Sequence, residues 1–177
     1  MARQNQDQER LSLKTRKLKP EENDRFFFIL WEDETEIAKF DLNNRNPGEV
    51  FKIGITSPDH DYSIKNILDE TTLIEFHGNG TRLEAECKGW FGNCIYIHHN
   101  DKEYQLLRTL LTRNFILVEE NMIEVGRIQP ESFFSDNYLI QFSKDFSFLL
   151  LLFICGLALC DSERPQMPVS NSYWYYG

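Results

Sequence analysis

The chain has 177 residues, of which 27% are charged and 14% aromatic, and its formal net charge is −9 at pH 7. This length suffices for one domain with a well-formed core. The acidic balance excludes binding of nucleic acid across the surface as a whole, so no nucleic-acid partner is expected. The charge is uneven, because residues 1–20 carry six cationic against two acidic residues.

The N-terminal residues 1–23 are polar, and we predict that they form a flexible basic arm ahead of the folded domain. Four cations of this arm are candidates for contact with anionic lipid headgroups, namely Lys14, Arg16, Lys17 and Lys19. Near a membrane surface each such residue contributes about 1 kcal/mol of attraction. The alternative is a solvated tail that makes no such contact.

Eleven short segments between residues 25 and 142 are rich in aromatic and β-branched residues and alternate with turns dense in Gly, Asn, Asp and Pro. Short strands with frequent turns favour an antiparallel sandwich or barrel. The predicted strands cover residues 25–31, 36–42, 50–55, 62–68, 73–76, 83–87, 94–98, 104–107, 114–118, 122–128 and 138–142.

The longest apolar run is FSFLLLLFICGLALC at residues 146–160. As a helix it would be about 22 Å long at 1.5 Å per residue, which is short for a bilayer core that needs about 20 residues. No face of this helix suits water, so either the protein or a membrane must enclose it. Because a closed sheet needs a filled interior, we expect a β-barrel around this helix, with Ser143 as its N-cap. The side chains assigned to the centre of the barrel are Phe148, Leu151, Leu152, Ile154 and Leu157.

The resulting domain organisation has three parts. A flexible arm covers residues 1–23, a mostly-β domain with its central helix covers residues 24–161, and a flexible tail covers residues 162–177. The N-terminus lacks the apolar core of a signal peptide. We therefore expect reduced thiols and a cytoplasmic location, either free or on the cytoplasmic side of the plasma membrane.

No feature of the sequence indicates an enzyme. There is no nucleophile motif such as GxSxG and no constellation of paired carboxylates. The cysteines lack the Cys-x-x-Cys spacing of zinc sites. His98 and His99 would point to opposite faces of a strand, so they cannot share a metal ion.

The segment 125–163 resembles the C-terminal part of phospholipid scramblases. It reads VGRI at 125–128, FSD at 134–136 and NYLIQF at 137–142, followed by Asp145 and the apolar run. Scramblases carry a Val-Gly-Lys-Ile strand, a Phe-Thr-Asp segment, an Asn-Phe-x-Ile-Gln-Phe strand, an Asp-containing turn and an apolar helix in the same order. They share a superfamily with tubby-like and LURP-one-related proteins. The resemblance implies a closed antiparallel barrel of 12 strands around a central C-terminal α-helix.

The same resemblance implies a membrane-phospholipid role, with lipid binding and calcium-dependent movement of lipid between leaflets. Its calcium candidates here are Asp136, Asn137 and Asp145. Read without the resemblance, these residues are equally a pair of turn residues and an acidic partner for the helix dipole. No other cofactor is expected.

A second class of function stays open from the sequence. The chain lacks the cysteine-rich, palmitoylated segment of scramblases, and Ser147 stands at a position that is acidic in their calcium-binding segment. A tubby-like or LURP-one-like barrel that acts as a soluble protein-interaction scaffold, without lipid transport, fits the same pattern. Its partner would be a protein. This alternative stays open because the fold alone does not determine the function.

Overall fold

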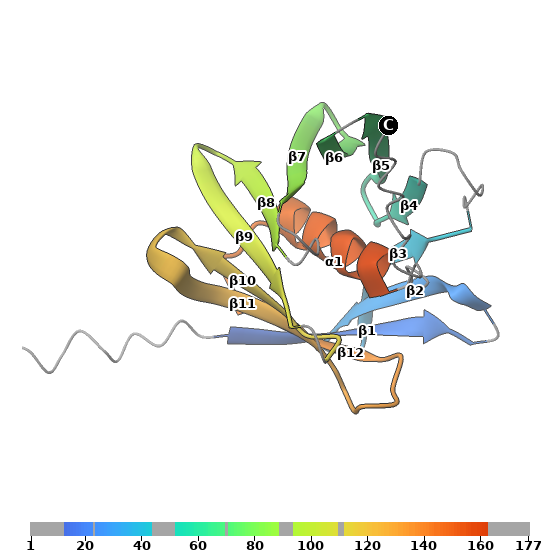
Figure 1. The fold of residues 1–177 in the computed structure, drawn as a ribbon. Helices are drawn as coiled ribbons and strands as arrows, with labels where there is room; N and C mark the ends of the chain where they lie inside the picture. The colour runs from blue at the N-terminus through green and yellow to red at the C-terminus, as the bar shows by residue number, and fades with distance from the viewer. Residues whose placement is uncertain are drawn as a thin grey trace, which may run out of the picture.

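Twelve antiparallel strands and one α-helix make up the computed structural model, which describes residues 13–22, 24–43, 52–69, 71–88, 94–109 and 112–162 (Figure 1). A short 3₁₀ turn, η1 (Glu120–Met122), joins β10 to β11. The strands are β1 (Leu13–Glu21), β2 (Asp24–Glu32), β3 (Thr35–Asp41), β4 (Lys52–Thr56), β5 (Asp61–Asp69), β6 (Thr71–Gly78), β7 (Thr81–Lys88), β8 (Cys94–His99), β9 (Lys102–Arg108), β10 (Phe115–Glu119), β11 (Ile123–Pro130) and β12 (Tyr138–Ser143), and the helix is α1 (Phe148–Ser162).

Each strand pairs with its neighbours in sequence, and β1 also pairs with β12, so the sheet closes into a barrel. Side chains alternate along the strands between the interior and the outer surface, as in β8, where Ile95 and Ile97 are buried between less buried neighbours. The expected fold class, a closed antiparallel barrel of 12 strands with one C-terminal helix, is confirmed.

The predicted start of the domain is wrong, because β1 lies inside the segment assigned to a flexible arm. Leu18 of β1 is fully buried and pairs with Leu30 of β2 and Tyr138 of β12. The eleven predicted strands correspond to β2–β12, and an up-and-down closure of eleven strands would bring its first and last strands together in parallel. The twelfth strand makes the closure antiparallel throughout. The remainder of the arm, residues 1–12, lies outside the described residues.

Helix α1 starts two residues later than predicted and is capped by a different serine. Ser143 is the last residue of β12. The N–H of Leu150 donates to Oγ of Ser147 at 3.4 Å, and the N–H of Leu151 donates to the carbonyl oxygen of Ser147 at 2.9 Å. Ser147 is therefore the N-cap residue. The helix extends to Ser162, and the rest of the predicted tail, residues 163–177, lies outside the described residues.

The apolar helix runs through the middle of the ring of strands (Figure 1). Four of the five predicted central residues, Leu151, Leu152, Ile154 and Leu157, are at most 1% exposed. Phe148 differs, with 39% of its surface exposed at the end of the barrel where the helix starts. Among the described residues, no helix is both long enough and apolar enough to cross a membrane.

The helix and the barrel wall approach closely at Gly156. A Cβ atom at this position would lie 2.1 Å from Cδ1 of Ile64 on β5, a distance that no real contact tolerates. The glycine thus lets α1 lie against the wall, and Phe153 packs its ring 5.5 Å from that of Phe76. Buried side chains of α1 and of the strands form one apolar core inside the barrel.

Candidate functional site

A pocket of about 620 Å³ opens at the end of the barrel where β12 finishes and α1 starts. We call it the β1–β2 pocket, because most of its wall comes from the start of β1 and the end of β2, with Lys144 added by the loop that follows β12. It is lined by Leu13, Lys14, Thr15, Arg16, Glu32, Asp33 and Lys144. Two of the four predicted headgroup cations are therefore in this pocket.

The alternation of β1 divides those four cations. Arg16 lies on the same face as the core residue Leu18 and is only 7% exposed. Lys14 shares that face, whereas Lys17 and Lys19 point to the outer surface. Lys17 is half exposed and lies 4.0 Å from a carboxylate oxygen of Glu131. The structure therefore does not bring the four cations into one site.

Glu32 connects the two cations of the pocket. Nζ of Lys14 lies 2.8 Å from Oε2 of Glu32 and 3.5 Å from Oδ2 of Asp33. Nε of Arg16 donates to Oε1 of Glu32 at 2.7 Å. The hydrogen bond to Glu32 raises the pKa of Lys14. Partial burial acts to raise the pKa of Glu32, but the hydrogen bond from Lys14 and the charge of Arg16 outweigh it and hold that pKa below its ordinary value.

The guanidinium of Arg16 is only partly satisfied. Its Nη1 is buried and has no hydrogen-bond partner among the residues that the structure describes. The group also acts on the helix: burial raises the pKa of the Cys155 thiol to about 12, and the charge of Arg16 opposes that rise. A buried donor without an acceptor costs about 1–3 kcal/mol, more when it is charged. Such an atom is uncommon in a folded protein and calls for an explanation.

The predicted calcium ligands do not come together. Asp136 and Asn137 precede β12, and Asp145 follows it. A strand of six residues spans about 20 Å, whereas calcium ligands lie within 2.6 Å of their ion. Asp136 instead accepts a hydrogen bond from Nη1 of Arg113 at 2.9 Å, and the side-chain amide of Asn137 donates to Glu131 at 3.0 Å. One calcium ion cannot contact all three candidates.

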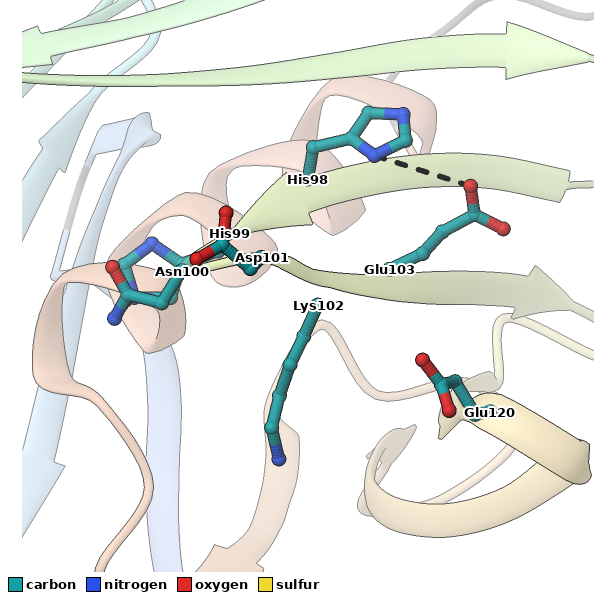
Figure 2. Close-up of a pocket in the computed structure, with 7 residues that line it drawn as sticks. All are labelled: His98, His99, Asn100, Asp101, Lys102, Glu103 and Glu120. Carbon is teal, nitrogen blue, oxygen red and sulfur yellow. Dashed lines mark hydrogen bonds and ion pairs between the residues drawn. The ribbon is translucent and has the colours of Figure 1, made fainter.

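A second pocket, of about 420 Å³, lies beside the turn between β8 and β9. Figure 2 shows His98 turned toward Glu103, 3.9 Å away, while His99 lies beside Asn100 at 3.0 Å. Lys102 points away from both histidines and pairs with Glu119. In the described ranges, no group of three or more His, Cys, Asp or Glu side chains is placed to hold a metal ion.

The loop between β11 and β12 exposes two aromatic rings that sequence reasoning did not single out as a surface. Phe133 and Phe134 are 73% and 91% exposed and contact each other edge to face, with ring centroids 5.0 Å apart. The backbone N–H of Glu131 donates to the carbonyl oxygen of Asn137 at 2.8 Å, which closes the base of the loop. The loop lies at the end of the barrel opposite the β1–β2 pocket.

An ion cluster on the outer face of β6 and β7 was also missed. Glu75 is 7% exposed and accepts hydrogen bonds on both oxygens, one from Arg82 and one shared with Nε2 of His77 at 2.7 Å. Arg82 reaches Glu84 as well, at 2.8 Å. The hydrogen bond with His77 is the main cause of a lowered pKa at Glu75; burial opposes it, and the charge of Arg82 adds to it.

Comparison with known proteins identifies no relative of this chain: no protein-family model, curated protein or solved structure matches it. Two surfaces stand out among the described residues. One is the β1–β2 pocket, with its partly satisfied arginine, and the other is the aromatic loop at Phe133 and Phe134. The barrel and these two surfaces are the basis for inferring function.

Proposed function

We propose that this protein is a peripheral phospholipid-binding barrel of the scramblase and tubby-like kind, acting at the cytoplasmic face of a membrane. The resemblance over residues 125–163 implies a 12-stranded barrel around a central helix, and the chain has this architecture. The observation that carries the proposal is the burial of α1 from Leu150 to Cys160 inside the barrel, because it leaves the outer surface for lipid contact.

The energy of burial favours contact at the surface over insertion of the helix. Burial of about ten large apolar side chains is worth roughly 15–30 kcal/mol before entropy. A domain whose net stability is about 5–15 kcal/mol cannot withdraw that helix and remain folded. We therefore propose lipid binding by the intact barrel, and any movement of lipid between leaflets would have to occur without transfer of α1 into the bilayer.

Flotation of the purified chain with lipid vesicles tests this proposal. Vesicles of phosphatidylglycerol and phosphatidylcholine are compared with vesicles of phosphatidylcholine alone, and each bound fraction is then washed with alkaline carbonate. The proposal predicts that the protein floats with the anionic vesicles and is released by the wash. Retention after the wash would place α1 in the bilayer, and absence of flotation would exclude the lipid-binding function.

A protein-interaction scaffold is the second candidate, and the aromatic loop is the observation that favours it. Exposed apolar groups of this kind mark contact sites, and aromatic residues are enriched at the centres of protein interfaces. The loop carries the exposed carboxylates Glu131 and Asp136, which are paired with Lys17 and Arg113, so it offers no excess of positive charge to an anionic membrane. Under this candidate the variant Phe133→Ser/Phe134→Ser loses a protein contact, whereas vesicle flotation by the wild type is absent.

A further inference from the structure

We propose that the β1–β2 pocket binds a phosphate group that carries one negative charge, such as a phosphodiester, through Arg16, Lys14 and Lys144. The proposal deepens the proposed function by assigning it a site, and it rests on that function only for the source of the phosphate. A phospholipid headgroup and a soluble phosphodiester offer the same chemistry, so the experiment below treats them separately.

The first argument is the incomplete satisfaction of Arg16. Its side chain is 8% exposed, it lines the pocket, and its Nε is fixed by Glu32, which orients the planar guanidinium. Nη1 then remains as a charged donor with no acceptor in the described part of the chain. Guanidinium groups bind phosphate oxygens through strong, charge-assisted hydrogen bonds. An anion in the pocket would satisfy the buried donor once the side chain turns Nη1 toward it.

The second argument is the charge balance of the pocket. Its wall holds the cations Lys14, Arg16 and Lys144 and the carboxylates Glu32 and Asp33, which leaves a net charge of +1. Glu32 is held by Lys14 and Arg16, whereas Asp33 is 80% exposed and can turn toward water. Lys144 lies on an exposed loop and makes no ion pair among the described residues. One singly charged anion therefore neutralises the pocket without displacing a fixed carboxylate.

The third argument is the composition of the wall. The three cations come from two neighbouring segments of the chain, the start of β1 and the loop after β12. The tetrahedral oxygens of a phosphate can meet donors from several directions, whereas a carboxylate offers two oxygens in one plane. Leu13 lines the same pocket and is 53% exposed, which places an apolar side chain beside the cations. That arrangement suits a phosphate attached to an apolar group.

The test uses the full chain and three probes: dimethyl phosphate, inorganic phosphate and vesicles of phosphatidylglycerol in phosphatidylcholine. Binding of the two soluble probes is followed by NMR titration, and binding of vesicles by flotation. The main variant is Lys14→Gln/Lys144→Gln. Its matched control is Lys17→Gln/Lys19→Gln, which removes the same charge from the outer face of the same strand. Circular dichroism establishes that each variant is folded, and Lys144→Gln alone replaces the main variant if the loss of the Lys14–Glu32 pair prevents folding.

We expect the main variant to weaken binding of dimethyl phosphate and of the anionic vesicles by about tenfold or more, since two charge-assisted contacts are lost. The control should weaken vesicle binding by less than about threefold and leave dimethyl phosphate binding unchanged. Equal losses of binding in both variants would show that the probes are attracted by the overall charge of β1. That result would contradict the pocket as the binding site. Tighter binding of inorganic phosphate than of dimethyl phosphate would contradict the proposal that the bound phosphate carries one negative charge.

The probes also separate this inference from the proposed function. Binding of dimethyl phosphate without flotation on vesicles would support the pocket and overturn the membrane function. Flotation that is unchanged in the main variant would support the membrane function and overturn the pocket. If the wild type binds none of the three probes, both proposals are wrong.

Discussion

Two charged side chains are buried in the described part of the barrel, and their surroundings differ. Glu75, on the outer face of β6, meets Arg82 with one oxygen and His77 with the other. Arg16, at the end of the barrel where α1 starts, meets Glu32 through Nε and leaves Nη1 unpaired among the described residues. Both carboxylate oxygens of Glu75 thus have hydrogen-bond partners within the protein, whereas the guanidinium of Arg16 keeps one donor without a partner among the described residues.

This difference in pairing distinguishes a stabilising role from a binding role at two side chains of similar burial. A buried charge that is fully paired stabilises or orients neighbouring strands, and its removal leaves its partners unpaired. A buried charge that keeps a free donor adds little to stability, because part of its desolvation cost is uncompensated. Glu75 therefore belongs to a structural cluster, and this contrast supports our assignment of Arg16 to the proposed binding site.

The largest effect is expected from Leu151→Asp, which places a charge in the barrel interior with no partner. Leu151 is 1% exposed on α1. The cost of burying an unpaired carboxylate exceeds the net stability of a domain of this size, so we expect the chain not to fold. Circular dichroism and thermal unfolding measure this outcome. The control Leu151→Met should cost less than about 1.5 kcal/mol, and a folded Leu151→Asp protein would show that α1 is not enclosed.

Glu75→Gln is expected to lower the free energy of unfolding by about 1–3 kcal/mol, because the hydrogen bonds of a charged group to Arg82 and His77 are weakened. Urea unfolding at pH 7 measures the change. Glu84→Gln is the matched control, since Glu84 contacts the same arginine but is nearly half exposed, and we expect less than about 1 kcal/mol there. An equal change in the two variants would show that the buried carboxylate of Glu75 stabilises the fold no more than the exposed carboxylate of Glu84.

The contribution of Glu75 should depend on pH in a defined direction. Its pKa in the folded protein lies below the ordinary value of 4.5, so the carboxylate stabilises the fold above pH 4.5 and loses this contribution as the pH falls through the folded pKa. The stability difference between the wild type and Glu75→Gln should thus shrink as the pH falls below 4.5. A difference that grows below pH 4.5 would contradict the assigned ion cluster.

Arg16→Met is expected to change the free energy of unfolding by no more than about 1 kcal/mol in either direction. The variant loses the bond from Nε to Glu32 but also removes an unpaired buried donor, and Glu32 keeps its contact with Lys14. Urea unfolding gives the comparison with Glu75→Gln directly. A loss of more than about 3 kcal/mol would mean that Arg16 is a structural residue like Glu75.

The smallest effect is expected from Lys17→Gln on the outer face of β1. The pair between Lys17 and Glu131 is long, at 4.0 Å, and both side chains are well exposed. Exposed pairs of this kind contribute about 0–1 kcal/mol. Stability in urea and flotation on anionic vesicles should both stay within experimental error of the wild type. Loss of flotation in this single variant would show that lipid binds at the outer face of the strand and not in the pocket.

Most of the barrel was predictable from the sequence, because alternating apolar residues and turn residues mark β2–β12. Strand β1 lacks this signal, since its inward positions include the cations Lys14 and Arg16 before Leu18. Two clues pointed to a twelfth strand: an antiparallel closure requires an even number of strands, and the resemblance implied 12. Lys14 and Arg16 interrupt the apolar alternation of β1, and the same two residues line the pocket. Sequence reasoning that missed the strand therefore missed the pocket as well.

Proximity in sequence was a poor guide to proximity in space at two other places. Asp136 and Asp145 are nine positions apart, yet β12 separates them by its whole length. The four cations of β1 are nearly consecutive, yet the strand directs them to two faces. The exposure of Phe133 and Phe134 could not be predicted at all, because apolar residues in a strand-rich chain are usually buried.

The comparison between Arg16 and Glu75 can be tested most directly by NMR of the arginine Nε–H groups in a titration with dimethyl phosphate. Arg16 is assigned from the spectrum of Arg16→Met, and Arg82, the partner of Glu75, from that of Arg82→Lys. We predict that the Arg16 resonance shifts and saturates while the Arg82 resonance stays in place. An Arg16 resonance that does not move, or one that moves no more than that of Arg82, would contradict the assignment of the β1–β2 pocket as a phosphate-binding site.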